Sequence, residues 1–198
     1  MLRARRAPSR ARLRRRGFAL EYATLGWNVV GVVVLAFAAR SASSVALVGF
    51  GLDSLIEVGA SAVVLWELSG TDGTRERRAL RLIGVAFGLL ALYLVVQSTI
   101  VLATGHHARP SPLGIVWTAV TAAVMFALAV GKTRTGSALG NPVLQAEGRV
   151  THVDAILAVA VLIGLMLNAA MGWWWADALA GYVLAGYAAR EVRAIFRR

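Results

Sequence analysis

The stretch from Ser44 to Trp66 reads SVALVGFGLDSLIEVGASAVVLW, and it decides the class of this protein. It is long and apolar enough to cross a lipid bilayer as one helix, which needs about 20 residues. Yet it carries two carboxylates, Asp53 and Glu57. A carboxylate in hydrocarbon costs about 2.5–3.5 kcal/mol on insertion scales, so it normally faces a bundle interior or an aqueous cavity. The i, i+4 spacing puts both acids on one helix face. The pattern predicts a buried site for a cation or a proton.

The composition around this stretch is that of a membrane protein. Hydrophobic residues make up 58% of the 198 residues, and 20 residues are glycine. This is more apolar than an ordinary soluble domain. Cysteine is absent, which excludes disulfide bonds, thiolate metal sites and thiol redox centres.

Six apolar stretches follow one another along the chain, each near the length of a spanning helix. They cover about residues 18–39, 44–66, 80–104, 112–131, 150–170 and 174–190. We expect an all-α integral membrane protein, a six-transmembrane-helix bundle in which residues 132–142 form the polar connection between the fourth and fifth spans. The expected divisions are a basic tail at 1–17, the bundle at 18–192 and a short basic tail at 193–198.

The net charge of +11 is distributed as membrane topology requires. Eight arginines lie in the first sixteen residues, and further basic residues lie in the second-to-third connection, at Lys132 and Arg134, and after Arg190. Only Arg40 and Arg109 lie on the other side, so the positive-inside rule places both termini in the cytoplasm. The run from Phe18 to Ala39 is longer than the apolar core of a signal peptide. We expect the basic tail to touch lipid headgroups and no nucleic acid, because no aromatic context accompanies it.

Other polar residues within the spans fall on single helix faces. Glu21, Thr24 and Asn28 form a stripe that fits a helix–helix seam and a cavity wall equally well. Glu147, Thr151 and Asp154 share one face of the fifth span, and His152 points away from Asp154 by the 100° step of a helix.

One more acid lies within the expected spans. Asp177 lies a turn inside the belt Trp173–Trp175, where a helix N-terminus favours an acid. No basic residue is expected at the depth of Asp53 and Glu57, since Arg149 is placed near the cytoplasmic boundary. Two adjacent carboxylates without a counter-ion do not both stay charged, so either a bound cation or a shared proton is predicted.

At this point the residues resemble a known family. The segment LDSLIEVGAS is similar to the acidic second-helix motif D-S-L-x-D of the cation diffusion facilitator family, with Asp53 and Glu57 on its two acidic positions. Asp154 matches the aspartate of the family's fifth-helix motif His-x-x-x-Asp, and GWWWADALAGYVLAGYAAREV looks like its sixth helix. The resemblance covers about residues 20–193. It implies a transporter, not an enzyme, that exports divalent metal ions in exchange for protons.

The resemblance also implies the roles of single residues. Asp53, Glu57 and Asp154 are the expected metal ligands, in a protein without a permanent cofactor, whose cargo is manganese, iron, zinc or cobalt. Around the ligands or along a proton pathway we expect a second set of polar residues: Glu21, Asn28, Glu147, Thr151, His152 and Asp177. A homodimer in a bacterial-type inner membrane is a further expectation, with close helix contacts at Gly84-x-x-x-Gly88 and Gly181-x-x-x-Ala185.

The chain departs from the family pattern in two places. Val150 occupies the position of the fifth-helix histidine, which leaves oxygen ligands and favours manganese or iron(II) over zinc. The family's cytoplasmic metal-binding domain is not present in this sequence. Two other functions therefore stay open, a membrane scaffold or accessory subunit that does not transport, and a proton-coupled exporter of small organic cations.

Overall fold

The structure, a computed structural model, is a bundle of six helices. It describes residues 9–42, 45–70, 73–105, 109 and 111–197. The helices are α1 (Arg10–Ala42), α2 (Val45–Ser69), α3 (Gly73–Thr104), α4 (Pro112–Leu139), α5 (Pro142–Met171) and α6 (Ala176–Phe196). The described residues contain no strand, and the all-α prediction is confirmed.

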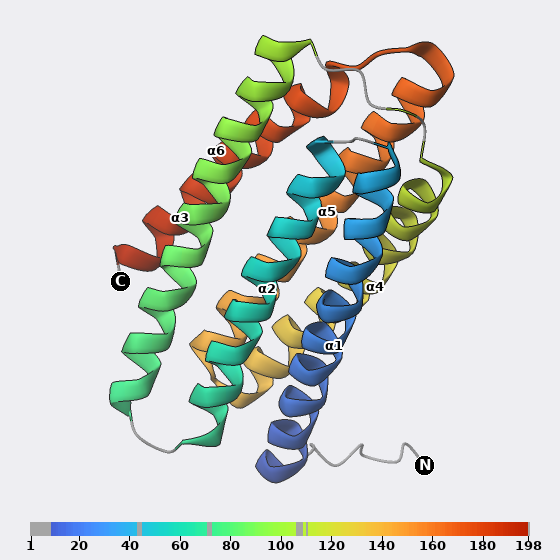
Figure 1. Cartoon of the computed structure of the whole chain (residues 1–198). Coiled ribbons are helices and arrows are strands. Elements are labelled where there is room, and N and C mark those ends of the chain that lie inside the picture. Colours follow the sequence, from blue (N-terminus) through green and yellow to red (C-terminus); the bar gives the residue numbers. More distant parts are fainter. Residues whose placement is uncertain (1–8, 43–44, 71–72, 106–108, 110, 198) are drawn as a thin grey trace, which may run out of the picture.

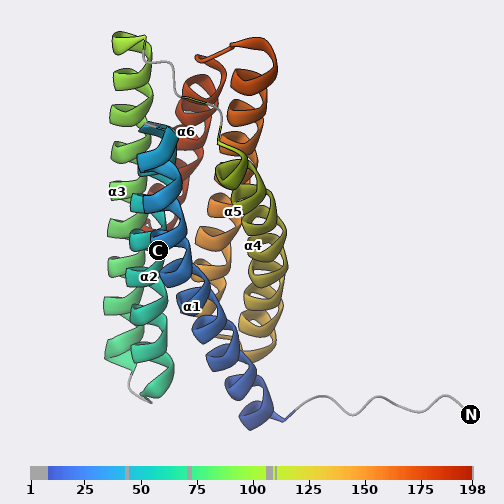
Figure 2. The ribbon, with the colours of Figure 1, turned by 45° about the vertical axis from the view of Figure 1, so that its right-hand side comes forward.

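The helices run up and down, so that alternate connections lie at opposite ends (Figure 1). One end of the bundle holds the starts of α1, α3 and α5 and the ends of α2 and α4. The opposite end holds the ends of α1, α3 and α5 and the starts of α2, α4 and α6. Helix α5 lies at the centre, in contact with α2, α3, α4 and α6, while α1 packs against α2 and α4. Figure 2 shows α1 crossing in front of α2 and reaching α4 at the lower end. Because α2 packs against α5, the helix faces that carry Asp53, Glu57 and Asp154 are buried together.

The expected connection at 132–142 was wrong in extent. Helix α4 continues to Leu139, and only Gly140 and Asn141 separate it from α5. Gly140 ends α4 in the left-handed region at φ +64°, a conformation that glycine adopts without strain. Asn141 then caps α5, its side chain accepting a hydrogen bond from Leu144 N at 2.8 Å, with Pro142 in the first turn. The polar residues before this turn are thus helical.

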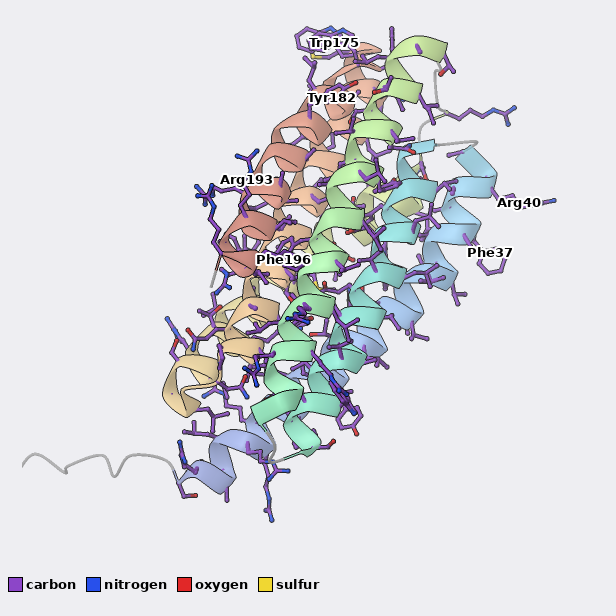
Figure 3. The ribbon with its side chains drawn as sticks, turned by 90° about the vertical axis from the view of Figure 1, so that its left-hand side faces the viewer. Phe37, Arg40, Trp175, Tyr182, Arg193 and Phe196 are labelled. Carbon is purple, nitrogen blue, oxygen red and sulfur yellow. The ribbon has the colours of Figure 1, made fainter. Side chains whose placement is uncertain are left out.

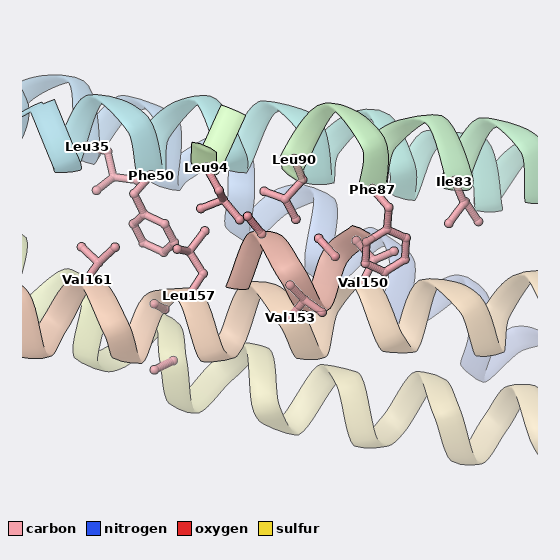
Figure 4. Close-up of a cluster of buried hydrophobic side chains, with 14 of the residues drawn as sticks. Leu35, Phe50, Ile83, Phe87, Leu90, Leu94, Val150, Val153, Leu157 and Val161 are labelled. Atoms are coloured by element: carbon pink, nitrogen blue, oxygen red, sulfur yellow. The ribbon is translucent and has the colours of Figure 1, made fainter. Parts of the chain in front are cut away.

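Apolar side chains fill the bundle and also cover its outside. A buried cluster joins α5 to α1, α2 and α3, and includes Phe50, Phe87 and Leu157 (Figure 4). On the outer surface many large apolar side chains are exposed, among them Phe37 at 69%. Figure 3 shows Phe37 and Arg40 projecting outward from the last turns of α1. Such a surface suits lipid rather than water.

Four helical segments among the described residues are long and apolar enough to cross a membrane: α1, residues 77–104 of α3, α4 and α5. The protein is therefore a multi-pass membrane protein. Gly84, expected at a dimer contact, instead packs against α6 of the same chain. A Cβ on Gly84 would lie 2.6 Å from the Phe196 ring. Gly88 has open space around it, and the side-chain surroundings of Gly181 lie outside the described part.

Candidate metal site and its buried ion-pair network

The three predicted ligands are buried between α2 and α5. Asp53, Glu57 and Asp154 are each no more than 3% exposed. Asp53 lies near both Asp154 and Glu57, and Glu57 is close enough to Asp154 for the two charges to interact. Asp53 Oδ2 and both oxygens of Asp154 receive no hydrogen bond from the described part of the chain. Two facing carboxyl groups of this kind require either a shared proton or a cation between them.

The third carboxylate is held differently. Thr151 donates its hydroxyl proton to Glu57 Oε1 at 2.7 Å, a short bond from α5 to α2. Within the described residues, no three acidic or histidine side chains form a ready-made coordination shell. In this conformation Asp53 and Asp154 face each other while Glu57 is bonded to Thr151. The ligand assignment remains a prediction.

The expectation that no basic residue reaches this region was wrong. Lys132 is fully buried on α4, and its ammonium forms ion pairs with Glu147 Oε1 at 3.0 Å and Glu21 Oε2 at 3.1 Å. It also donates to Thr151 Oγ1 at 3.0 Å. The apolar pattern placed Lys132 in the connection between the fourth and fifth spans, because residues 132–135 are all polar. Since α4 continues as a helix, Lys132 instead extends the buried face that includes Met125.

This buried face offered a signal for finding Lys132. Thr118, Met125, Ala129 and Lys132 recur at helical spacing and are all buried. The Gly-Asn-Pro turn at 140–142 marks the helix end eight residues later. Hydropathy alone ended the span too early, at residue 131.

The polar stripe of α1 is a helix–helix seam at one position and a set of local bonds at the others. Glu21 joins Lys132 of α4. Thr24 donates to the carbonyl of Leu20, and Asn28 donates to the carbonyl of Thr24, so both side chains bond within α1. Between these two residues, the Trp27 ring stacks on Trp117 of α4 with centroids 4.9 Å apart, and its Nε1 donates to Thr121.

Other predicted residues lie away from the carboxylates or outside the described side chains. His152 packs edge-on against Phe126 of α4, with ring centroids 5.4 Å apart. Val150, at the position of the family histidine, is buried in the same apolar cluster as Phe87 and Leu90 (Figure 4). Asp177 lies in the first turn of α6, but its side chain is outside the part that the structure describes.

Close packing of α4 on α5 brings Lys132 to its partners. A Cβ on Gly148 would lie 2.5 Å from Thr133 Oγ1 and 2.9 Å from Thr133 N, and a Cβ on Gly136 would lie 2.8 Å from Gln145 N. Only residues without a side chain allow the two backbones to approach this closely. The glycines on facing sides of the α4–α5 hairpin thus position the ion pair between Lys132 and Glu147.

Comparison with known proteins identifies the family of this chain. Residues 80–198 match the family described as the cation efflux transmembrane domain. A protein named cation-efflux pump FieF from Shewanella oneidensis is 33% identical over 88 residues, which cover 42% of this chain and 29% of that protein. Magnetosome protein MamB from Magnetospira sp. (strain QH-2) is 27% identical over 148 residues, 69% of this chain and 50% of that protein. The chain spans half or less of these relatives. Because the family match covers more than half of the chain, this protein belongs to the cation efflux family.

Proposed function

We propose that this protein moves divalent metal cations across a bacterial inner membrane in exchange for protons. The observation that carries the proposal is the pair Asp53 and Asp154, two buried carboxyl groups from facing helices. Among the described residues, Asp53 Oδ2 and both oxygens of Asp154 have no donor. Together with Glu57 they supply hard oxygen ligands for the metal. The family membership and the names of the two relatives support a metal cation as cargo.

The proposed cycle follows from the charges. When no metal is bound, Asp53 and Asp154 share a proton; a divalent cation arriving from the cytoplasm displaces it and binds the three carboxylates. Because these side chains are shut inside the bundle, release on the far side requires the helices to move against each other. The proposal includes six spans, cytoplasmic termini and a homodimer. Val150, buried among apolar side chains, supports a preference for manganese or iron(II) over zinc.

The test combines bound metal with flux. Purified protein is analysed for metal by mass spectrometry, and proteoliposomes with a proton gradient are tested for uptake of Mn²⁺, Zn²⁺ and a quaternary amine. We expect bound metal and proton-driven Mn²⁺ flux in the wild type, and loss of both in Asp53→Asn. Flux of the amine alone would identify an organic-cation exporter. Neither metal nor flux would identify a protein that does not transport.

A further inference from the structure

Lys132 places its ammonium among three oxygens inside the bundle, donating hydrogen bonds to two of them and forming an ion pair with the third. An ammonium group has three N–H donors. Its nitrogen lies 3.0–3.1 Å from three oxygens, those of Glu147, Glu21 and Thr151. Because it reaches α5 at two points and α1 at one, the ammonium is fixed in place. A fully buried lysine is rare unless it is paired in this way.

The bond from Lys132 to Thr151 determines where the threonine proton points. A hydroxyl group has one proton to donate. Since Thr151 Oγ1 accepts from Lys132 at 3.0 Å, its proton is directed to Glu57 Oε1, at 2.7 Å. The result is a chain of donors from a cation through a hydroxyl to a carboxylate, in which each bond strengthens the next. Lys132 and Glu57 are thereby linked without touching.

We propose that Lys132 is a positioning residue for the cation site, acting on Glu57 through Thr151. This inference rests on the proposed function, in which Glu57 is a ligand. Asp53 and Asp154 repel Glu57 when all are charged, and no basic side chain in the described residues forms an ion pair with any of the three. The bond from Thr151 holds the Glu57 carboxylate in position before the cation arrives. Partners of this kind behind a ligand change metal affinity by about 10–100-fold.

The position of the network fits such a role. Lys132 lies seven residues before the end of α4, and Glu147 lies five residues after the start of α5, at the same end of the bundle. Thr151 follows Glu147 by one turn, and Asp154 follows by almost another. A cation entering from that end meets the network before it reaches the carboxylates. The positive charge of Lys132 is already balanced there by Glu21 and Glu147.

The experiment measures the Kd of Mn²⁺ and of Zn²⁺ on purified full-length protein, Mn²⁺ by the electron paramagnetic resonance signal of the free ion and Zn²⁺ by titration calorimetry. The variants are Lys132→Met, Thr151→Val and their combination. We expect each single change to weaken binding about 10–100-fold. The combination should be no weaker than the weaker single variant, because both act through one chain of bonds. Thr151→Ser, which keeps the hydroxyl, should bind as the wild type does.

A matched control is Thr135→Val, because Thr135 is also buried on α4 but its hydroxyl has no hydrogen-bond partner in the described part. It should leave the Kd unchanged. If Lys132→Met does not fold, the variant Lys132→Met/Glu21→Gln/Glu147→Gln, in which all three positions are uncharged, takes its place in the same measurement. A purely structural role would lower the yield or thermal stability without producing the non-additive effect with Thr151→Val.

The outcomes separate the two proposals. Two results would overturn the positioning role: wild-type affinity in Lys132→Met or Thr151→Val, or losses of affinity that multiply in the combined variant. Neither result would affect the proposed site, provided that metal binding still depends on Asp53. If the wild type binds neither metal, or if Asp53→Asn binds as well as the wild type, the proposed site itself fails, and the role of Lys132 fails with it.

Discussion

Removing the ammonium of Lys132 should be the most damaging single change in the bundle. Lys132→Met leaves Glu21 and Glu147 buried and unbalanced, each having lost a partner at 3.0–3.1 Å. At this distance, with an effective dielectric constant of 20, each pair is worth about 5 kcal/mol of Coulomb energy. Desolvation of the three charges offsets most of this. We therefore expect a loss of about 3–5 kcal/mol in the free energy of unfolding, the range found when one partner of a buried pair is removed.

The assay is reversible unfolding in mixed detergent micelles, followed by tryptophan fluorescence. Trp27 and Trp117 stack between α1 and α4, so their emission reports separation of the helices that Lys132 joins. Arg134→Met is the matched control, because Arg134 lies exposed on the same helix, and its removal should change the free energy by no more than about 0.5 kcal/mol.

A second variant distinguishes lost charge balance from lost packing. Lys132→Met/Glu21→Gln/Glu147→Gln removes all three charges and keeps the side-chain lengths. Replacing a whole buried ion network is often near neutral, so this variant should recover at least half of the stability lost in Lys132→Met. The reasoning is refuted if Lys132→Met costs less than about 1 kcal/mol, or if the triple variant is less stable than the single one.

Three further predictions test other parts of the bundle. Gly148→Ala brings a Cβ within 3 Å of the Thr133 backbone nitrogen and should cost about 1–3 kcal/mol in the same unfolding assay, while Gly88→Ala, with open space around it, should be neutral or stabilising; equal effects would contradict the close packing of α4 on α5. Asp154→Asn should abolish proton-driven Mn²⁺ uptake in proteoliposomes without lowering the unfolding midpoint, and flux at the wild-type rate would exclude Asp154 as a ligand. Val150→His should raise the affinity for Zn²⁺ relative to Mn²⁺ by at least about tenfold in competition measurements, because imidazole suits zinc, and an unchanged ratio would remove the reason for expecting a manganese preference.

The fold was largely predictable because its main determinant is the distribution of apolar residues. Runs of about 20 such residues must form helices that satisfy their own backbone hydrogen bonds in lipid. The helix ends were less predictable, since hydropathy finds the segment in lipid rather than the whole helix. Helices α1, α4 and α5 each extend beyond their apolar runs, by eight residues in the case of α1, which begins at Arg10 rather than at residue 18.

The buried acids of the candidate site could be predicted from the free-energy cost of a carboxylate in lipid, whereas the burial of Lys132 could not. A carboxylate in the middle of an apolar run, such as Asp53, stands out because the run otherwise contains only Glu57 and three serines as polar residues. Lys132 lies among polar neighbours, where a charge is expected to face water. Its burial depends on Glu21, more than a hundred residues earlier, and on Glu147, which follows the turn at Asn141. Only the packing of α4 against α1 and α5 brings these three residues together.

Lys132 divides the buried acids of the bundle into two groups with different chemistry. Glu21 and Glu147 share one fixed ammonium, so a metal ion would have to displace a tethered cation to bind them. Asp53 and Asp154 have no such partner among the described residues, and Glu57 receives only the hydroxyl of Thr151. A mobile cation gains the most binding free energy at buried carboxylates that have no fixed positive partner. Under the proposed function, the same lysine that stabilises the first group would therefore direct an incoming metal to the second.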